Sequence, residues 1–222
     1  MMRLLHNNRG FLTFLLLLGL FRTAVADWNP IPSGSMHPTL LEGDVVFVNR
    51  LAYDLKVPLT DRIILHLGAP SRGDVVTFSS PTDGTRLIKR LVALPGDTIE
   101  MRNKVLVING EAAAYVPLVQ EFPEISSDAP WRVVQRTESL GGAQHPVQWL
   151  DHAPAKDNFG PVTLAADTYW MLGDNRDNSA DSRYIGAVPR EKLIGKAVRV
   201  LVSADILGHW LPRWERLGQP LV

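Results

Sequence analysis

Two hydroxyl side chains lie in a short segment that begins and ends with proline. Ser33 and Ser35 lie between Pro32 and Pro38, and Gly34 separates them. Proline restricts the backbone and glycine allows close approach, so the segment predicts a small rigid loop with two hydroxyls and several backbone N–H groups. Such a loop suits a serine nucleophile beside an oxyanion site. The same residue types also form ordinary turns, so this segment alone does not identify an enzyme.

A lysine in an apolar run is the candidate base. Leu87, Lys89 and Leu91 share one face of a predicted strand, which places the amine among apolar neighbours. Burial there would lower the pKa of the lysine. For a lysine to act as a base near neutral pH, its pKa must fall from about 10.4 to roughly 7–8. A hydrated surface site cannot supply that shift. The alternative is an edge-strand lysine whose amine extends into water.

Residues 173–183, called the polar block below, alternate carboxylates, amides, hydroxyls and guanidinium groups. This density predicts a polar network that satisfies its own hydrogen bonds. Asp174, Asp177 and Asp181 could offer oxygen ligands to calcium, but the segment has no loop-closing glutamate and contains two arginines. We therefore expect no metal here, and no cofactor for the chain.

The elements that must position these residues are short strands. β-branched and apolar runs alternate with turn residues after residue 28, and no long amphipathic helix is predicted before the C-terminal tail. The sequence therefore predicts a mostly β fold. The predicted strands are residues 45–48, 75–78, 86–94, 105–108, 162–164, 169–172 and 194–202.

The strand pattern weakens in the middle of the chain. We interpret residues 111–162 as an inserted smaller β subdomain or extended hairpin with little chemistry. The expected organisation is a hydrophobic segment over 1–27, a catalytic β domain over 28–110 and 163–202, this insertion, and a tail over 203–222.

The tail places four large apolar side chains at helical spacing, although a proline interrupts the pattern. Packing against the core is the favoured interpretation, and a membrane contact anchored by tryptophan is the alternative. The four side chains are Leu207, Trp210, Leu211 and Trp214.

The N-terminal segment is related to export. A basic start, an apolar run over 11–21 and small residues at Ala24 and Ala26 match a cleavable signal. The apolar run would span about 16 Å as a helix, against a hydrocarbon core of roughly 30 Å. Extension to Ala26 gives about 24 Å, and Arg22 could reach the headgroups, so an uncleaved anchor stays open. In both cases the basic start favours a cytoplasmic N-terminus.

Composition excludes several classes of protein. The chain has 222 residues and a formal net charge of zero, with no long run of one sign, so we expect no nucleic-acid partner. It has no cysteine, which excludes disulfides, thiolate metal sites and a cysteine nucleophile. The length allows one large domain, or a catalytic domain with an insertion.

Four segments together resemble the characteristic boxes of bacterial type I signal peptidases. The resemblance runs from the N-terminal segment to about residue 202, except for the middle insertion. It implies an antiparallel sheet or partial barrel as the catalytic core, and a Ser–Lys serine endopeptidase that removes signal peptides after a small residue. The four segments are residues 32–40, 72–76, 88–97 and 173–183.

The resemblance also implies roles for single residues. Ser35 would be the nucleophile and Lys89 the general base. The Ser33 hydroxyl and the Ser35 backbone N–H would form the oxyanion hole. Ser179 would bond and orient the lysine amine, and Met36 would pack beside it.

Further residues would support the site or contact the substrate. Asp174, Asp181 and Arg183 would hold the polar block in place. Two residues near the pockets depart from the family pattern: Leu87 stands where many relatives have tyrosine, and Asn29 stands where an aromatic residue often occurs. The expected substrate pocket comprises Ile31, Pro32, Leu40, Leu87 and Ile88.

The resemblance favours the anchor over a cleaved signal. It implies a single-pass protein of the bacterial inner membrane, with the catalytic domain on the periplasmic side. The expected partners are preprotein signal peptides and membrane lipid, and we expect a monomer.

Three alternatives are weighed against this interpretation. A Ser–His–Asp triad would need a histidine, and His37 adjoins Ser35 on the same loop. A self-cleaving repressor-type protease would need a DNA-binding module, where this chain has a hydrophobic leader. A secreted β-rich binding protein would leave the four segments unexplained.

Overall fold

The computed structural model describes residues 8–118, 132–151 and 153–221. Residues 1–7 of the predicted hydrophobic segment and 119–131 of the predicted insertion lie outside these ranges. The predicted division of the chain into domains stays a prediction.

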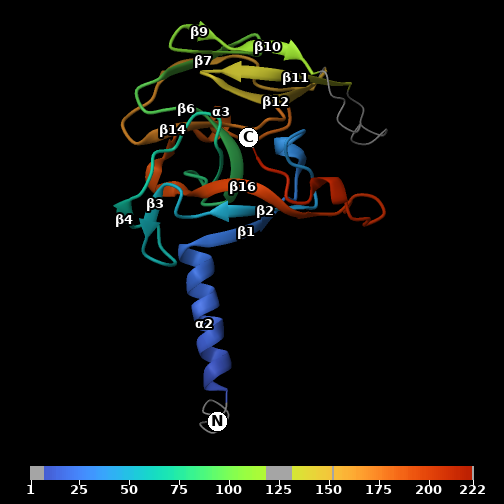
Figure 1. Cartoon of the computed structure of the whole chain (residues 1–222). Helices are drawn as coiled ribbons and strands as arrows, with labels where there is room; N and C mark the ends of the chain where they lie inside the picture. The colour runs from blue at the N-terminus through green and yellow to red at the C-terminus, as the bar shows by residue number, and fades with distance from the viewer. Residues whose placement is uncertain (1–7, 119–131, 152, 222) are drawn as a thin grey trace.

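The first described element is the helix α2, Arg9–Ala24, which extends away from the β body (Figure 1). It has no buried residue, and it leads at once into strand β1. Among the residues that the structure describes, no helix is both long and apolar enough to cross a membrane.

A seven-stranded antiparallel sheet forms the largest part of the molecule and confirms the predicted mostly β fold. Its strands curl around a shared interior (Figure 1). Strand β6 lies between β5 and β14, so both of its edges are paired, and Lys89 lies opposite Val76 of β5. In spatial order the strands are β1 (Ala26–Pro30), β2 (Asp44–Asn49), β16 (Leu193–Ser203), β5 (Val75–Ser79), β6 (Arg86–Ala93), β14 (Thr168–Leu172) and β15 (Val188–Pro189).

Three smaller sheets complete the β structure. The strands β7 (Thr98–Arg102), β8 (Val105–Ile108), β9 (Glu111–Ala112) and β13 (Phe159–Thr163) form one of them. Strands β10 (Ala114–Pro117), β11 (Val133–Leu140) and β12 (Ala143–Leu150) form the second, called the inserted sheet below. Strands β3 (Asp54–Lys56) and β4 (Ile63–His66) form a hairpin. The remaining helical turns are η1 (Gly34–Met36), α3 (Ser182–Ile185), η2 (Arg190–Lys192) and η3 (Trp214–Arg216).

Tight turns explain the compact path from β7 to β9. Asn103 and Lys104 both have positive φ between β7 and β8, and Asn109 and Gly110 do so between β8 and β9. Two-residue turns with positive φ at both positions match the twist of paired strands, so they favour hairpins. The predicted strand over 105–108 is confirmed as β8, and these turns pair it with β7 and β9.

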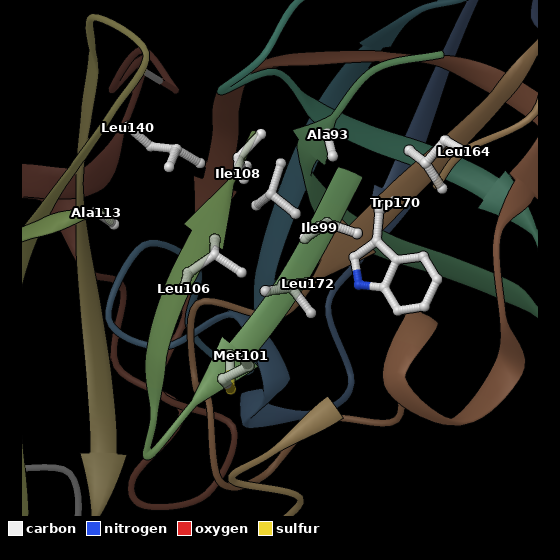
Figure 2. Close-up of a cluster of buried hydrophobic side chains, with 11 residues drawn as sticks. Ala93, Ile99, Met101, Leu106, Ile108, Ala113, Leu140, Leu164, Trp170 and Leu172 are labelled. Atoms are coloured by element: carbon white, nitrogen blue, oxygen red, sulfur yellow. The ribbon is translucent and has the colours of Figure 1, made fainter. Parts of the chain in front are cut away.

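A hydrophobic cluster joins the large sheet to the smaller ones (Figure 2). Ala93 and Leu172 come from the large sheet, Leu106 comes from β8, and Leu140 comes from the inserted sheet. Phe159 stacks on Trp170 with the ring centroids 5.3 Å apart. The inserted sheet is thus packed on the strands that carry the candidate site.

The tail does not form the predicted packing stripe. Leu207, Trp210, Leu211 and Trp214 are exposed by 69%, 70%, 63% and 73%. The segment from Asp205 to Pro212 forms turns and an isolated bridge instead of a helix, so helical spacing does not bring the four side chains to one buried face.

Candidate active site

The serine loop, residues 31–40, is held by its apolar side chains. Met36 and Leu40 are fully buried, and they join a cluster that includes Ile31 and strands β2 and β16. Ser33 is extended and exposed, and Ser35 follows on η1, where it is half-buried. The apolar residues therefore hold the loop inward while Ser35 stays accessible.

Lys89 meets the geometric condition for a base beside Ser35. The lysine is 2% exposed. Its Nζ donates hydrogen bonds to Ser35 Oγ at 2.6 Å and to the Ile88 carbonyl oxygen at 2.9 Å. In the described part of the chain, no carboxylate forms an ion pair with this amine.

Burial sets the protonation of this lysine. It lowers the pKa of Lys89 to about 8, although the carboxylates of Asp181 and Asp174 act in the opposite direction. A pKa near 8 leaves a substantial fraction of the amine neutral close to physiological pH, which a general base requires.

The polar block contacts the serine loop from behind. Asn175 Nδ2 donates to the Gly34 carbonyl at 3.0 Å, and the Asn175 backbone N–H donates to the Ser35 carbonyl at 3.2 Å. Gly173 permits this approach, because a Cβ at that position would lie 2.5 Å from the Ser35 carbonyl oxygen and would also clash with Ser179.

Ion pairs hold the polar block, as its composition suggested. Asp174 accepts bonds of 2.8 Å at both carboxylate oxygens from Arg90, and both residues are fully buried. Asp181 accepts two bonds of 2.8 Å from Arg183 and caps α3 through the Arg183 backbone N–H. Asp181 also accepts a bond from the Gly173 N–H at 3.0 Å.

The inserted sheet supplies buried polar groups that sequence reasoning missed. Glu138 on β11 and His145 on β12 are both buried. Glu138 accepts a hydrogen bond from Arg176 of the polar block, and His145 Nε2 lies 3.1 Å from Glu138 Oε1. The expectation of little chemistry in this segment therefore overlooked a structural contribution. The sequence showed only the arginine itself, since its burial and its carboxylate partner are visible only in the structure.

Two expected lysine contacts differ in outcome. Ser179 Oγ is buried and has no hydrogen-bond partner among the described residues, so the expected bond to Lys89 is absent. The amine instead uses Ser35 and the Ile88 carbonyl. Met36 is buried in the cluster behind the serine loop, and its packing beside the amine stays a prediction.

The expected substrate-pocket residues are only partly brought together. Ile31 and Pro32 line an apolar groove of about 550 Å³, together with Trp210 and Trp214 of the tail. Leu40 is fully buried in the same cluster as Ile31 and does not line this groove, so its place in the substrate pocket stays a prediction. Leu87 and Ile88 are half-buried on β6 and do not line this groove.

The His37 side chain is hydrogen-bonded to Glu42 and not to Ser35. Its Nε2 lies 2.6 Å from Glu42 Oε2, and this is its hydrogen bond in the described structure. Within the described ranges, no group of three or more histidine, aspartate or glutamate side chains has the arrangement of a metal site.

The chain is similar to known proteins over most of its length. A family model described as "Signal peptidase, peptidase S26" matches residues 5–202. Signal peptidase I of Pseudomonas fluorescens is 35% identical over 229 residues, which covers 97% of this chain and 78% of that protein. Signal peptidase I of Pseudomonas aeruginosa is 35% identical over 228 residues, with the same coverage of both chains.

A signal peptidase I of Enterococcus faecalis with a crystal structure is 28% identical, covers 58% of this chain and 96% of its own, and has a TM-score of 0.35. The family model and the two Pseudomonas relatives cover the serine loop, Lys89 and the polar block together. The chain therefore belongs to the signal peptidase family, peptidase S26, whose members are serine endopeptidases that remove signal peptides.

Proposed function

We propose that the chain cleaves preproteins with Ser35 as nucleophile and Lys89 as general base. The observation that carries this proposal is the 2.6 Å separation of Lys89 Nζ and Ser35 Oγ, with the lysine 2% exposed. Burial that lowers the pKa of Lys89 to about 8 provides the neutral amine. A neutral amine can accept a proton from the hydroxyl, which an ammonium group cannot.

The proposed reaction has two stages. Lys89 takes the proton of Ser35, Oγ attacks the scissile carbonyl carbon, and the lysine returns the proton to the leaving amine. Water then attacks the acyl carbon while the lysine accepts a proton from that water. The bond between the acyl carbon and Ser35 Oγ breaks, the lysine gives its proton to Oγ, and the cleaved signal peptide leaves with a new C-terminal carboxylate. The Ser33 hydroxyl and the Ser35 backbone N–H are the proposed donors to the oxyanion.

Substrate preference is proposed to follow from shallow apolar pockets. Ile31 and Ile88 offer apolar surface near the serine loop, which suits small residues in an Ala-X-Ala pattern. Leu87 contributes a branched aliphatic side chain there. Ile31 and Pro32 extend this surface into the apolar groove beside the tail.

A Ser–His–Asp triad has less support. His37 is the histidine next to Ser35, but its hydrogen bond goes to Glu42. In a triad the imidazole must bond the nucleophile while a carboxylate holds its other nitrogen. Here the hydrogen bond to Ser35 Oγ comes from Lys89.

We propose that the N-terminal segment is a retained single-pass anchor in the bacterial inner membrane, with the catalytic part on the periplasmic side. The bond after Ala26 lies inside β1, where Ala26 and Asp27 are only 4% and 3% exposed. Asp27 accepts hydrogen bonds from Arg22 and Arg86. A bond within a paired strand is poorly accessible to a protease, which supports retention.

Membrane lipid is the proposed partner of the exposed tail. Trp210 and Trp214 are exposed by 70% and 73%, and Leu207 and Leu211 are nearly as exposed. Tryptophan favours the interface between water and hydrocarbon, so such a surface suits the headgroup region. Contact there would place the serine loop beside a signal helix that is still in the bilayer. We propose a monomer without a nucleic-acid partner.

Cleavage of a model preprotein tests the dyad. Lys89→Met and Ser35→Ala in detergent-solubilised full-length protein should each lower kcat/KM by about 10³-fold or more, since the hydroxyl loses its base or is absent. Lys56→Met is the matched control, because Lys56 is also buried and its amine donates to the carbonyl oxygens of Glu191 and Leu193 instead. Near-normal cleavage by Lys89→Met, with loss in His37→Ala, would overturn the dyad.

N-terminal sequencing of membrane-extracted protein tests the anchor. A start within the first two residues supports retention of the segment. A start at Asp27 contradicts it, because the Ala26–Asp27 bond would then have been cleaved despite its place in β1.

A further inference from the structure

Three polar side chains lie side by side across the inserted sheet. Tyr115 of β10 lies opposite Glu138 of β11, and Glu138 lies opposite His145 of β12. Tyr115 donates its hydroxyl to Glu138 Oε2 at 2.6 Å, and His145 Nε2 lies 3.1 Å from Glu138 Oε1. Glu138 is fully buried. A buried carboxylate destabilises the folded state unless a charged or hydrogen-bonding partner compensates for the lost water, so we expect Glu138 to have such a partner.

The partner is Arg176 of the polar block. Its two terminal nitrogens donate to the two oxygens of Glu138 at 2.6 and 2.5 Å, which is a bidentate pair. Burial acts to raise the pKa of Glu138, but the charge and the two hydrogen bonds of Arg176 hold it well below its usual range. The carboxylate is therefore ionised, and the pair is fixed in both distance and orientation.

Backbone hydrogen bonds join the same two segments. The Gln148 N–H of β12 donates to the Asp174 carbonyl at 2.9 Å, and the Arg176 N–H donates to the Gln148 carbonyl at 2.9 Å. Arg176 Nε also donates to the Gly173 carbonyl at 3.2 Å, so its side chain braces the turn in which it lies. The start of the polar block is thus fastened to the edge of the inserted sheet.

The fastened residues include the one that contacts the nucleophile. Asn175 lies between Asp174 and Arg176, and it donates to the carbonyls of Gly34 and Ser35. A displacement of Arg176 would therefore move the donors that hold the backbone on both sides of the Ser35 Cα. Ser35 Oγ must stay within hydrogen-bond reach of Lys89, and that reach is short.

We infer that Glu138 is a positioning residue, which holds the Ser35 backbone in register with Lys89 through Arg176 and Asn175. The inserted sheet is then part of the catalytic apparatus, although none of its residues touches the reacting atoms. This inference rests on the proposed Ser35–Lys89 mechanism. A misplacement of about 1 Å caused by a distant change can cost roughly a hundredfold in rate, so the effect should be large enough to measure.

The test is Glu138→Gln in the full-length protein, assayed with the model preprotein well below its melting temperature. The amide keeps the size of the side chain but can accept only one of the two Arg176 bonds. We expect kcat to fall by about ten- to a hundredfold with KM nearly unchanged, because the groove is not altered. The pH midpoint of the remaining activity should stay where it is in the unmodified protein.

Two variants make the result specific. Tyr115→Phe removes one hydrogen bond to the same carboxylate but leaves the pair with Arg176, so it should lower Tm and keep kcat. Arg176→Lys keeps a positive charge but not the two-pronged geometry, so it should lower kcat as Glu138→Gln does. Arg176→Lys also carries the test if Glu138→Gln does not fold.

The outcomes separate this inference from the dyad. If Lys89→Met is inactive while Glu138→Gln loses Tm but keeps its kcat, the pair is merely structural and the inference is overturned. If kcat falls to the same extent in Glu138→Gln and Tyr115→Phe, the cause is a general destabilisation of the inserted sheet. That result also overturns the inference. A selective loss of kcat in Glu138→Gln supports it.

Discussion

Lys89 and its neighbour Arg90 are both buried basic side chains, but their hydrogen-bond partners differ. The two residues are consecutive on β6 and are 2% and 0% exposed. The Lys89 amine bonds a hydroxyl and a carbonyl oxygen, whereas the Arg90 guanidinium bonds both oxygens of Asp174. Both side chains are buried, but within the described ranges only the Arg90 side chain has a carboxylate as its partner.

The choice of residue type matches each environment. Arginine stays protonated in proteins and has a planar fork that fits a carboxylate, so it suits a permanent buried pair. Lysine changes its pKa readily when it is buried without a counter-charge. Arg176 repeats the arginine pattern with Glu138. Arg90 and Arg176 thus form structural ion pairs, whereas Lys89 contacts the candidate nucleophile.

Removal of the Asp174 carboxylate tests the ion pair of Arg90 and should have the largest effect of the changes proposed here. In Asp174→Asn the Arg90 guanidinium stays buried with only one acceptor in place of the carboxylate. We expect the free energy of unfolding to fall by about 3–5 kcal/mol, as for other buried pairs that lose one partner. Urea denaturation followed by circular dichroism measures this change.

An exposed pair provides the control for that loss. Glu100 accepts two bonds from Arg102, whose side chain is 71% exposed. Glu100→Gln should change stability by no more than about 1 kcal/mol, because solvent already screens the pair. Equal losses in Asp174→Asn and Glu100→Gln would contradict the view that burial makes the Arg90 pair essential.

The pH dependence of cleavage tests whether Lys89 acts as the base, and its expected effect is smaller. Only neutral Lys89 can accept the Ser35 proton, and burial lowers its pKa to about 8. As the pH rises the ammonium loses its proton, so kcat/KM should increase about tenfold per pH unit below 8 and level off above it. Initial rates with a model preprotein between pH 6 and 10 give the profile.

Lys56→Met is again the matched variant for this measurement. Burial also lowers the pKa of Lys56, but its amine bonds backbone carbonyls away from Ser35. Its profile should match that of the unmodified protein. A midpoint that moves in Lys56→Met, or one near 10 in the unmodified protein, would mean that Lys89 is not the titrating base.

Local patterns in the sequence predicted the strands well and the site incompletely. Period-two alternation placed Lys89 between Leu87 and Leu91, and Leu91 is indeed fully buried. Helical spacing failed in the tail, because Trp210 lies outside any helix, Trp214 begins the short turn η3, and both side chains are exposed. The irregular period of the insertion concealed β11 and β12, whose buried faces contain polar side chains such as Glu138.

The sequence by itself determined the mostly β fold, the family and the residue types that the chemistry needs. Only the tertiary structure decided that Lys89 Nζ meets Ser35 Oγ, since the two residues are 54 positions apart. The tertiary structure also decided which buried cations have a carboxylate partner: Arg90 pairs with Asp174 and Arg176 pairs with Glu138, whereas Lys89 has no such partner among the described residues. The physical reason is that a pKa depends on burial and on the charges nearby in space, and neither is set by neighbours along the chain.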